Sequence, residues 1–293
     1  MDKRKYKLKG HESFIIRDGW LTKGITAVDK DRRLFSVNSG ADALGVGTNM
    51  AKSIRYWMRA AGLTIDISNK GVTLSDFGRI IYEKDPYFED PFSLWIIHAN
   101  IACNFELATS WNLFFNYMTL TSSFSREDMF DMMKSLIIEY TGDSDPSDRS
   151  IKDDCAAILS MYSRTGGVGD DPEEKRNSPF EELGLISHIG NKYMRKRPMI
   201  DKIDPLVILF LILERLNEEK SMQIDSLTED ANMPGRILNL NRIAVNDFLD
   251  TLQNRGYITV NRTAGLDIIY PKKCINMTRK DLTEEYFKRS KRS

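Results

Sequence analysis

Glycine and turn residues divide residues 39–78 into an ordered series of short elements, and this order limits the folds open to the chain. Gly45 ends a first short helix, and Thr48 is a good N-cap for a longer second helix. A turn that contains Asn69 and Gly71 then joins two short strands. Helix, glycine turn, helix and hairpin is the order of a winged helix-turn-helix. The expected elements are helices at 41–44 and 49–61 and strands at 63–67 and 72–74.

The rest of the chain is predicted to be mainly helical. Asp90 followed by Pro91 is typical of a helix start, and Ser125 opens another helix with acids in its first turn. The last third repeats the order of the first, with a long helix at 241–255 and a hairpin after it. The fold class is therefore mainly α with small β-hairpin wings. The expected domains are a basic winged helix-turn-helix at 1–82, an acidic helical domain at 83–177 with a linker at 164–177, a second winged-helix-like domain at 178–272, and a basic tail at 273–293.

The net charge of zero conceals a strong segregation of charge along the chain. The number of Lys and Arg residues minus the number of Asp and Glu residues is +7 for residues 1–80, −12 for 81–190 and +5 for 191–293. Charge separated in this way is typical of domains with separate partners, and a basic domain is expected to bind nucleic acid. The alternative is that the cations cluster on solvated faces by chance.

The composition excludes several classes of protein. With 41% hydrophobic and 29% charged residues, the chain is an ordinary globular protein. The longest apolar run, residues 206–213, is far shorter than the ~20 residues of a membrane span. The three cysteines of the chain lie far apart in the sequence, which favours neither a zinc site nor a disulfide framework. We expect a soluble cytoplasmic protein with no membrane partner.

The outward faces of the two long helices differ in charge. The helix at 49–61 presents cations, an amide and an aromatic ring with no acid, a surface that suits phosphates and base edges. The helix at 241–255 presents Asp247, Asp250 and Asn254, and its carboxylates would repel a phosphate backbone. We therefore expect the first helix to contact DNA and the second to pack against another domain or chain, although winged helices also serve as protein-protein modules. The predicted DNA-binding residues are Thr48, Asn49, Lys52, Arg55, Tyr56 and Arg59.

The sequence offers only weak signals for catalysis. The glycine-rich strings lack the Lys-Ser/Thr of a phosphate-binding loop, and no histidine arrangement matches a nuclease motif. His11 beside Glu12 is a candidate acid-base pair, unless His11 satisfies buried polar groups in the core. Glu89 and Asp90 are candidate ligands for Mg²⁺, which favours carboxylate oxygens, although helix capping already accounts for Asp90.

Several strings together resemble a known bacterial family. They are Gly-His-Glu-Ser-Phe at 10–14, Leu-Gly-Val-Gly at 44–47, Ser-Ile-Arg-Tyr-Trp at 53–57, Asp-Pro-Tyr at 85–87 and Glu-Leu-Gly-Leu-Ile at 182–186. The chain resembles domain-of-unknown-function family four thousand and seven over nearly its whole length. The best-described members are the SspB-like components of DNA phosphorothioation systems, which nick DNA for single-strand backbone sulfur modification in phage defence.

The resemblance implies partners but no active site. It implies work beside a cysteine desulfurase, a sulfur transferase and an ATPase of the same system. The sequence leaves three functions open: a Mg²⁺-dependent DNA nickase, a non-catalytic DNA-binding adaptor whose acidic centre meets a protein partner, and a local transcriptional regulator.

Overall fold

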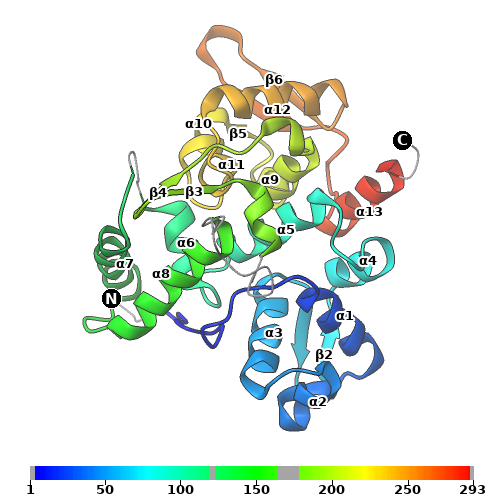
Figure 1. Ribbon diagram of the computed structural model, residues 1–293. Helices are drawn as coiled ribbons and strands as arrows, with labels where there is room; N and C mark the ends of the chain where they lie inside the picture. Colours follow the sequence, from blue (N-terminus) through cyan, green and yellow to red (C-terminus); the bar gives the residue numbers. More distant parts are fainter. Residues whose placement is uncertain (1–3, 119–122, 164–177, 291–293) are drawn as a thin grey trace.

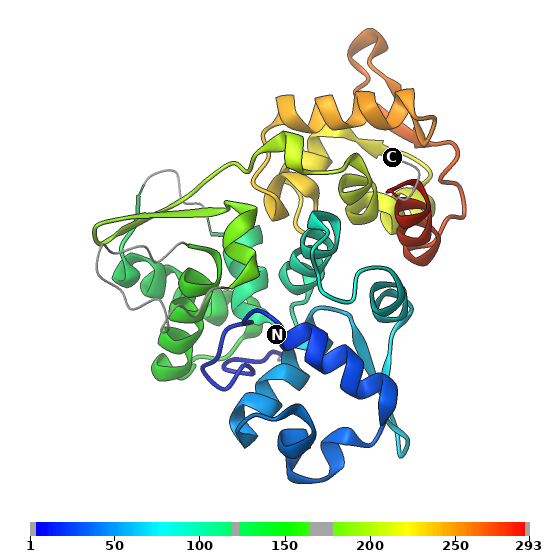
Figure 2. The ribbon, with the colours of Figure 1, turned by 45° about the vertical axis from the view of Figure 1, so that its right-hand side comes forward.

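The computed structural model describes residues 4–118, 123–163 and 178–290, which form three lobes around a central helix (Figures 1 and 2). As expected, the fold is mainly helical with small antiparallel hairpins. The predicted linker at 164–177 lies outside the described residues. Within the described ranges, no helix combines the length and apolar character that crossing a membrane requires.

The N-terminal lobe contains the elements expected from residues 39–78, preceded by a helix that the sequence analysis did not place. Gly45 has a left-handed φ of 62° at the turn between the second and third helices. Ser75 caps the last helix by accepting a hydrogen bond from the Gly78 N–H at 2.9 Å. The elements are α1 (Trp20–Lys30), α2 (Ala41–Leu44), α3 (Thr48–Ala60), β1 (Thr64–Ile67), β2 (Gly71–Leu74) and α4 (Asp76–Lys84). The expected domain boundary after residue 82 falls inside α4.

The middle of the chain forms four helices, and the first and third of them start at the predicted caps Asp90 and Ser125. The Asp90 carboxylate accepts from the Phe92 N–H at 2.9 Å, and Ser125 forms a reciprocal capping box with Asp128. The first of these helices is the central one in Figure 1 and is buried on nearly every face. The helices are α5 (Pro91–Cys103), α6 (Thr109–Asn116), α7 (Arg126–Thr141) and α8 (Asp148–Tyr162).

The C-terminal third begins with a hairpin that the sequence analysis missed, β3 (Ile186–Ile189) paired with β4 (Lys192–Arg195). A helical lobe with a small antiparallel sheet of order β5-β7-β6 follows, and its long helix and hairpin were both expected. The elements are α9 (Pro205–Glu219), β5 (Met222–Gln223), α10 (Ile224–Glu229), α11 (Pro234–Ile237), α12 (Arg242–Asn254), β6 (Ile258–Asn261), β7 (Ile268–Pro271) and α13 (Arg279–Ser290).

The expected basic tail contains a terminal helix, which docks on the rest of the chain. Helix α13 packs against α4 and α9, and Figure 1 shows it beside α4. The ring of Tyr286 stacks on Phe92 with 3.8 Å between centroids, and its hydroxyl donates to Asp90 at 2.8 Å. Lys280 pairs with Asp76 at 3.3 Å. The tail therefore joins the N-terminal lobe to the rest of the chain through specific contacts.

Candidate nucleic-acid interface

Helix α3 is fixed by an apolar inner face. Ile54, Trp57 and Met58 are fully buried. Helix α1 approaches this face so closely that a Cβ on Gly24 would lie 2.2 Å from the sulfur of Met58. Because one side of α3 is sealed against α1, its opposite side is the one left for solvent or a partner.

The exposed start of α3 carries the polar residues that the sequence predicts for DNA contact. Thr48, Asn49 and Lys52 are all exposed, and the Thr48 hydroxyl donates to the Asn38 side-chain oxygen at 3.1 Å. Lys52 forms no ion pair with any residue that the structure describes. Its ammonium is therefore available to an external anion.

Arg55 and Arg59 lie beside an acidic residue, whereas the sequence predicts that the outward face of α3 carries no acid. Both guanidiniums pair with one carboxylate, Asp66 on β1, at N–O distances of 2.9 Å. The acid comes from the neighbouring hairpin and not from α3, so a helical projection of α3 alone does not reveal it. The two arginines remain 42% and 37% exposed, and the cluster keeps a net charge of +1.

Tyr56 does not lie on the outward face, and the prediction that it does is wrong. Its side chain is buried, and its hydroxyl donates to the Leu107 carbonyl at 2.9 Å, in the segment before α6. Burial, followed by the nearby charge of Asp154, raises the pKa of Tyr56 well above its usual value. The sequence analysis assigned this side of α3 to solvent, but the middle of the chain covers it.

Three further cations lie beside the β1–β2 hairpin. Arg32, Arg33 and Lys70 are exposed, and none has a carboxylate partner in the described part of the chain. The hairpin approaches residue 32 closely, because the Val72 N–H donates to the Arg32 carbonyl at 2.8 Å. A Cβ on Gly71, which has φ of 90°, would lie 2.1 Å from that carbonyl oxygen. No local sequence pattern singles these residues out, although the positive charge of the first 80 residues indicates a basic surface.

The corresponding helix of the C-terminal lobe has a different surface. Arg262 of the β6–β7 connection pairs with Asp250 of α12 at 2.7 Å and also donates to the Asn246 side chain at 2.9 Å. Asp247 remains exposed on the same helix. This face is neutral to acidic, which agrees with the expectation that it is less suited to phosphate.

His11 is a buried anchor of the N-terminal segment. Its Nε2 lies 2.8 Å from an oxygen of Asp154 on α8, and the Ser110 hydroxyl donates to the other oxygen at 2.6 Å. The imidazole stacks on Trp57 of α3 and meets Trp111 edge-on. None of its surface is exposed. The geometry therefore favours the alternative in which His11 satisfies buried polar groups.

Glu12 does not complete a catalytic pair with His11. It is exposed, while the neighbouring imidazole is buried, and its own φ is 50°. An acid-base role for the two residues would require a substrate to reach a histidine that protein atoms enclose on all sides. The structure gives no support to the predicted pair.

The acidic residues before α5 cap backbone groups. Asp85 is buried and accepts from the Glu89 N–H at 2.9 Å and the Asp90 N–H at 3.3 Å. Burial raises the pKa of Asp85. Asp90 is held by its N-cap bond and by Tyr286, whereas Glu89 is exposed. The described residues contain no group of three or more His, Cys, Asp or Glu that could hold a metal ion. The Asp90 carboxylate already accepts from the Phe92 N–H and from Tyr286.

His98 is a second histidine enclosed in the core. It is fully buried on α5, where its Nε2 donates to the Ile237 carbonyl and its Nδ1 accepts from the Tyr162 hydroxyl, both at 2.9 Å. Burial lowers the pKa of His98 to about 4. This histidine is a neutral core residue that joins the central and C-terminal helices.

These features define a mainly helical protein with a helix-turn-helix-hairpin lobe at its N-terminal end. A family model described as "Protein of unknown function (DUF4007)" matches residues 8–287, and the chain belongs to this family. No protein with a curated description matches the chain.

Two solved structures share the fold. One is described as "SspB crystal structure", with a TM-score of 0.82 and 20% identity over 99% of this chain and 96% of that chain. The other is "Magnesium ion-bound SspB crystal structure", with a TM-score of 0.80 and 21% identity over 97% of this chain and 94% of that chain. At these identities the likeness establishes the fold alone.

Proposed function

We propose that the chain is a DNA-binding component of a DNA phosphorothioation system. In this proposal the N-terminal lobe acts as a winged helix-turn-helix, with α3 as the recognition helix and the β1–β2 hairpin as the wing. The observation that carries the proposal is a group of exposed cations on these elements and the loop beside them, which have no carboxylate partner among residues 4–118, 123–163 and 178–290. The group consists of Lys52, Lys70, Arg32 and Arg33.

Electrostatics supports a polyanionic partner for this group. Cations that contact phosphates release counterions from the duplex, and the logarithm of affinity falls by about 0.9 per contact for each tenfold rise in salt. Thr48 and Asn49 add hydrogen-bonding groups at the exposed start of α3, the part of a recognition helix that reaches base edges. Arg55 and Arg59 contribute less than free arginines would, because Asp66 already neutralises one of them.

The link to phosphorothioation rests on the family resemblance. It implies partners that transfer sulfur and hydrolyse ATP, and it implies a DNA substrate. Residues 81–190 carry a charge of −12, which suits contact with a basic protein surface and not with DNA.

Two charge-reversed variants with equal charge change test the proposal. The first changes Lys52, Lys70, Arg32 and Arg33 to Glu. The control changes four other exposed cations to Glu, none of which has an ion-pair partner in the described part of the chain, namely Lys196, Arg197, Lys202 and Lys272. For a labelled duplex, we expect the first variant to lose at least about 100-fold in affinity and its salt slope to fall by about 0.9 per contact removed. Equal losses in both variants would show that binding follows net charge, and the assignment to α3 would fail.

Between the nickase and the adaptor, the geometry favours the adaptor. His11 is enclosed, and the carboxylates near α5 cap backbone groups instead of forming a metal-binding set. Incubation with supercoiled plasmid, with and without Mg²⁺ or Mn²⁺, separates the two. We expect a mobility shift with the supercoil intact. Open-circle product that disappears on chelation would instead establish nicking.

A further inference from the structure

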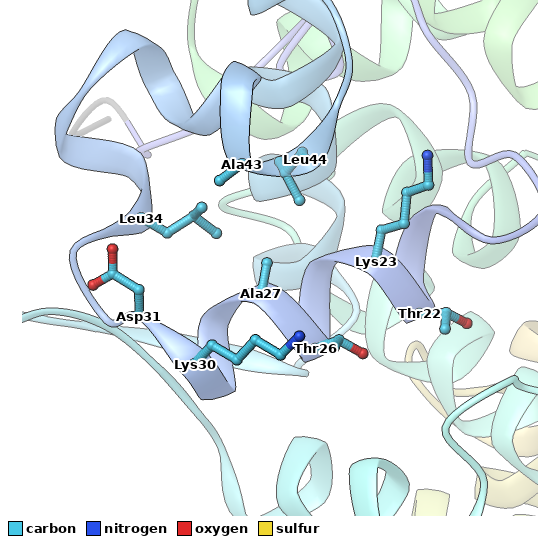
Figure 3. Close-up of a pocket in the computed structure, with 9 residues that line it drawn as sticks. All are labelled: Thr22, Lys23, Thr26, Ala27, Lys30, Asp31, Leu34, Ala43 and Leu44. Atoms are coloured by element: carbon cyan, nitrogen blue, oxygen red, sulfur yellow. The ribbon is translucent and has the colours of Figure 1, made fainter.

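A second surface of the N-terminal lobe is a pocket between α1 and α2, with a volume of about 480 Å³ (Figure 3). Leu34, Ala43 and Leu44 face Ala27 of α1 across it, so its walls are largely apolar. No residue of α3 lines it. The lining residues are Thr22, Lys23, Thr26, Ala27, Lys30, Asp31, Leu34, Ala43 and Leu44.

Two lysines of α1 flank the apolar part of this pocket. Lys23 and Lys30 are exposed, and neither has an ion-pair partner among the residues that the structure covers. They are seven residues apart, which places them on one face of α1 at a separation of about 10 Å along its axis. Thr22 and Thr26 add hydroxyl groups beside them. Asp31 adds one carboxylate, which accepts from the Arg33 N–H at 2.8 Å, so the charged side chains of the lining sum to +1.

The pocket lies on a different side of α1 from the contact with α3, but its lining residues Asp31 and Leu34 flank Arg32 and Arg33 of the proposed DNA-binding group. Gly24 is the point at which α1 meets the buried side of α3. The residues of α1 that line the pocket project, on average, about 130° from Gly24 around the helix. The proposed DNA-binding residues Lys52, Lys70, Arg32 and Arg33 do not line the pocket.

We propose that this pocket docks an acidic amphipathic segment of a partner protein. An apolar side chain of the segment enters between Ala27 and Leu34, and carboxylates on either side pair with Lys23 and Lys30. The spacing of the two lysines matches acids two turns apart on a helix or three residues apart on an extended chain. A phosphate backbone supplies the negative charge but has no apolar group for the pocket, so the surface fits a peptide better than DNA.

Peptide selection tests the specificity of the pocket. The full chain is used to select from a random displayed peptide library, with counter-selection against Ala43→Trp. Ala43 is exposed, so the tryptophan fills the pocket without entering the core. We expect the enriched peptides to carry an apolar residue between Asp or Glu residues. No enrichment over the filled variant, or enrichment without acidic residues, would overturn the proposal.

Binding measurements with the selected peptides complete the test. We expect Lys23→Glu with Lys30→Glu, and separately Ala43→Trp, to weaken peptide binding by at least about tenfold. The control Lys196→Glu with Arg197→Glu should bind the peptides as the unmodified chain does, and duplex DNA affinity should change less than about twofold in Ala43→Trp, which leaves the charge unchanged. If the pocket variants lose duplex DNA affinity and not peptide affinity, the surface belongs to nucleic acid. That result would not decide the α3 proposal, which the variant of Lys52, Lys70, Arg32 and Arg33 tests separately. Failure of the pocket proposal can therefore be told apart from failure of the proposed function.

Discussion

The carboxylate of Asp66 holds the guanidinium of Arg55 at 2.9 Å, although one residue lies on strand β1 and the other on helix α3. The same carboxylate also binds Arg59. In the proposed function, the Asp66 oxygens occupy a position that a DNA phosphate oxygen would otherwise take. The anion therefore competes with the duplex for two arginines.

Replacing Asp66 with Asn removes this competition. We expect affinity for duplex DNA to rise by about three- to tenfold, because Arg55 and Arg59 become available to phosphates. The slope of log affinity against log salt concentration should steepen by the amount expected for about one or two additional phosphate contacts. Fluorescence anisotropy titrations at several salt concentrations measure both quantities. Asp247→Asn on α12 makes the same change in net charge far from α3 and should leave affinity nearly unchanged. Equal gains in the two variants would indicate a general charge effect.

Asp154 should be a large contributor to stability. Its carboxylate accepts from His11, from the Ser110 hydroxyl and from the Lys9 N–H, and all three donors would lack a partner in Asp154→Ala. We expect the free energy of unfolding to fall by about 3 kcal/mol or more, because each unsatisfied buried donor costs about 1–3 kcal/mol. Urea denaturation measures the change. Exposed Glu12→Ala should cost less than about 0.5 kcal/mol, and a similar loss in both variants would contradict the structural role of the network.

His98 should make stability depend on pH in the acid range. Burial lowers its folded-state pKa to about 4, whereas the unfolded value is about 6.5. As pH falls below 6.5 the unfolded chain binds a proton first, so stability is lost progressively between pH 6.5 and 4, by about 3 kcal/mol in total. His98→Asn should flatten this part of the stability profile relative to the unmodified chain. Parallel profiles for the two proteins would refute the assignment.

Gly71 should be required for the shape of the hairpin. Its φ of 90° and its closeness to the Arg32 carbonyl both oppose a side chain. We expect Gly71→Ala to destabilise the lobe and also to weaken duplex binding, because Arg32 and Arg33 must move. Gly45→Ala is the matched control, since its φ is also left-handed but no atom lies within 4 Å of its Cβ position. Thermal denaturation measures the destabilisation caused by backbone strain, and fluorescence anisotropy measures the loss of duplex affinity caused by displacement of Arg32 and Arg33. Equal losses of duplex affinity in Gly71→Ala and Gly45→Ala would exclude displacement as the cause.

Local signals explain which elements the sequence predicted well. Gly45 and the cap residues Ser75 and Ser125 impose their conformations within a few residues, so helices α2, α3, α4 and α7 could be placed from the chain alone. Strands β3 and β4 were missed because their hairpin has exposed polar and apolar residues in mixture and gives no clear alternation.

The errors at the candidate site have a different origin. A helical projection of α3 places Tyr56 and Arg55 on one outward arc, but it contains no information on what packs beside the helix. Leu107 covers Tyr56 and Asp66 engages Arg55, and both come from other parts of the chain. The same limitation made His11 look like a reactive group, because its enclosure depends on Trp111 and Asp154, which are about 100 or more residues away.

The first residues of the chain form hydrogen bonds with the middle of the molecule as well as with the N-terminal lobe. The Lys7 and Lys9 N–H groups donate to Thr109 and Asp154, while the Phe14 carbonyl accepts from Trp57 of α3. Cutting the gene after residue 84 would therefore leave the imidazole of His11 without its carboxylate and uncover aromatic rings. The N-terminal lobe is therefore not readily transferred to other proteins as an independent domain, and members of the family should inherit the three lobes together.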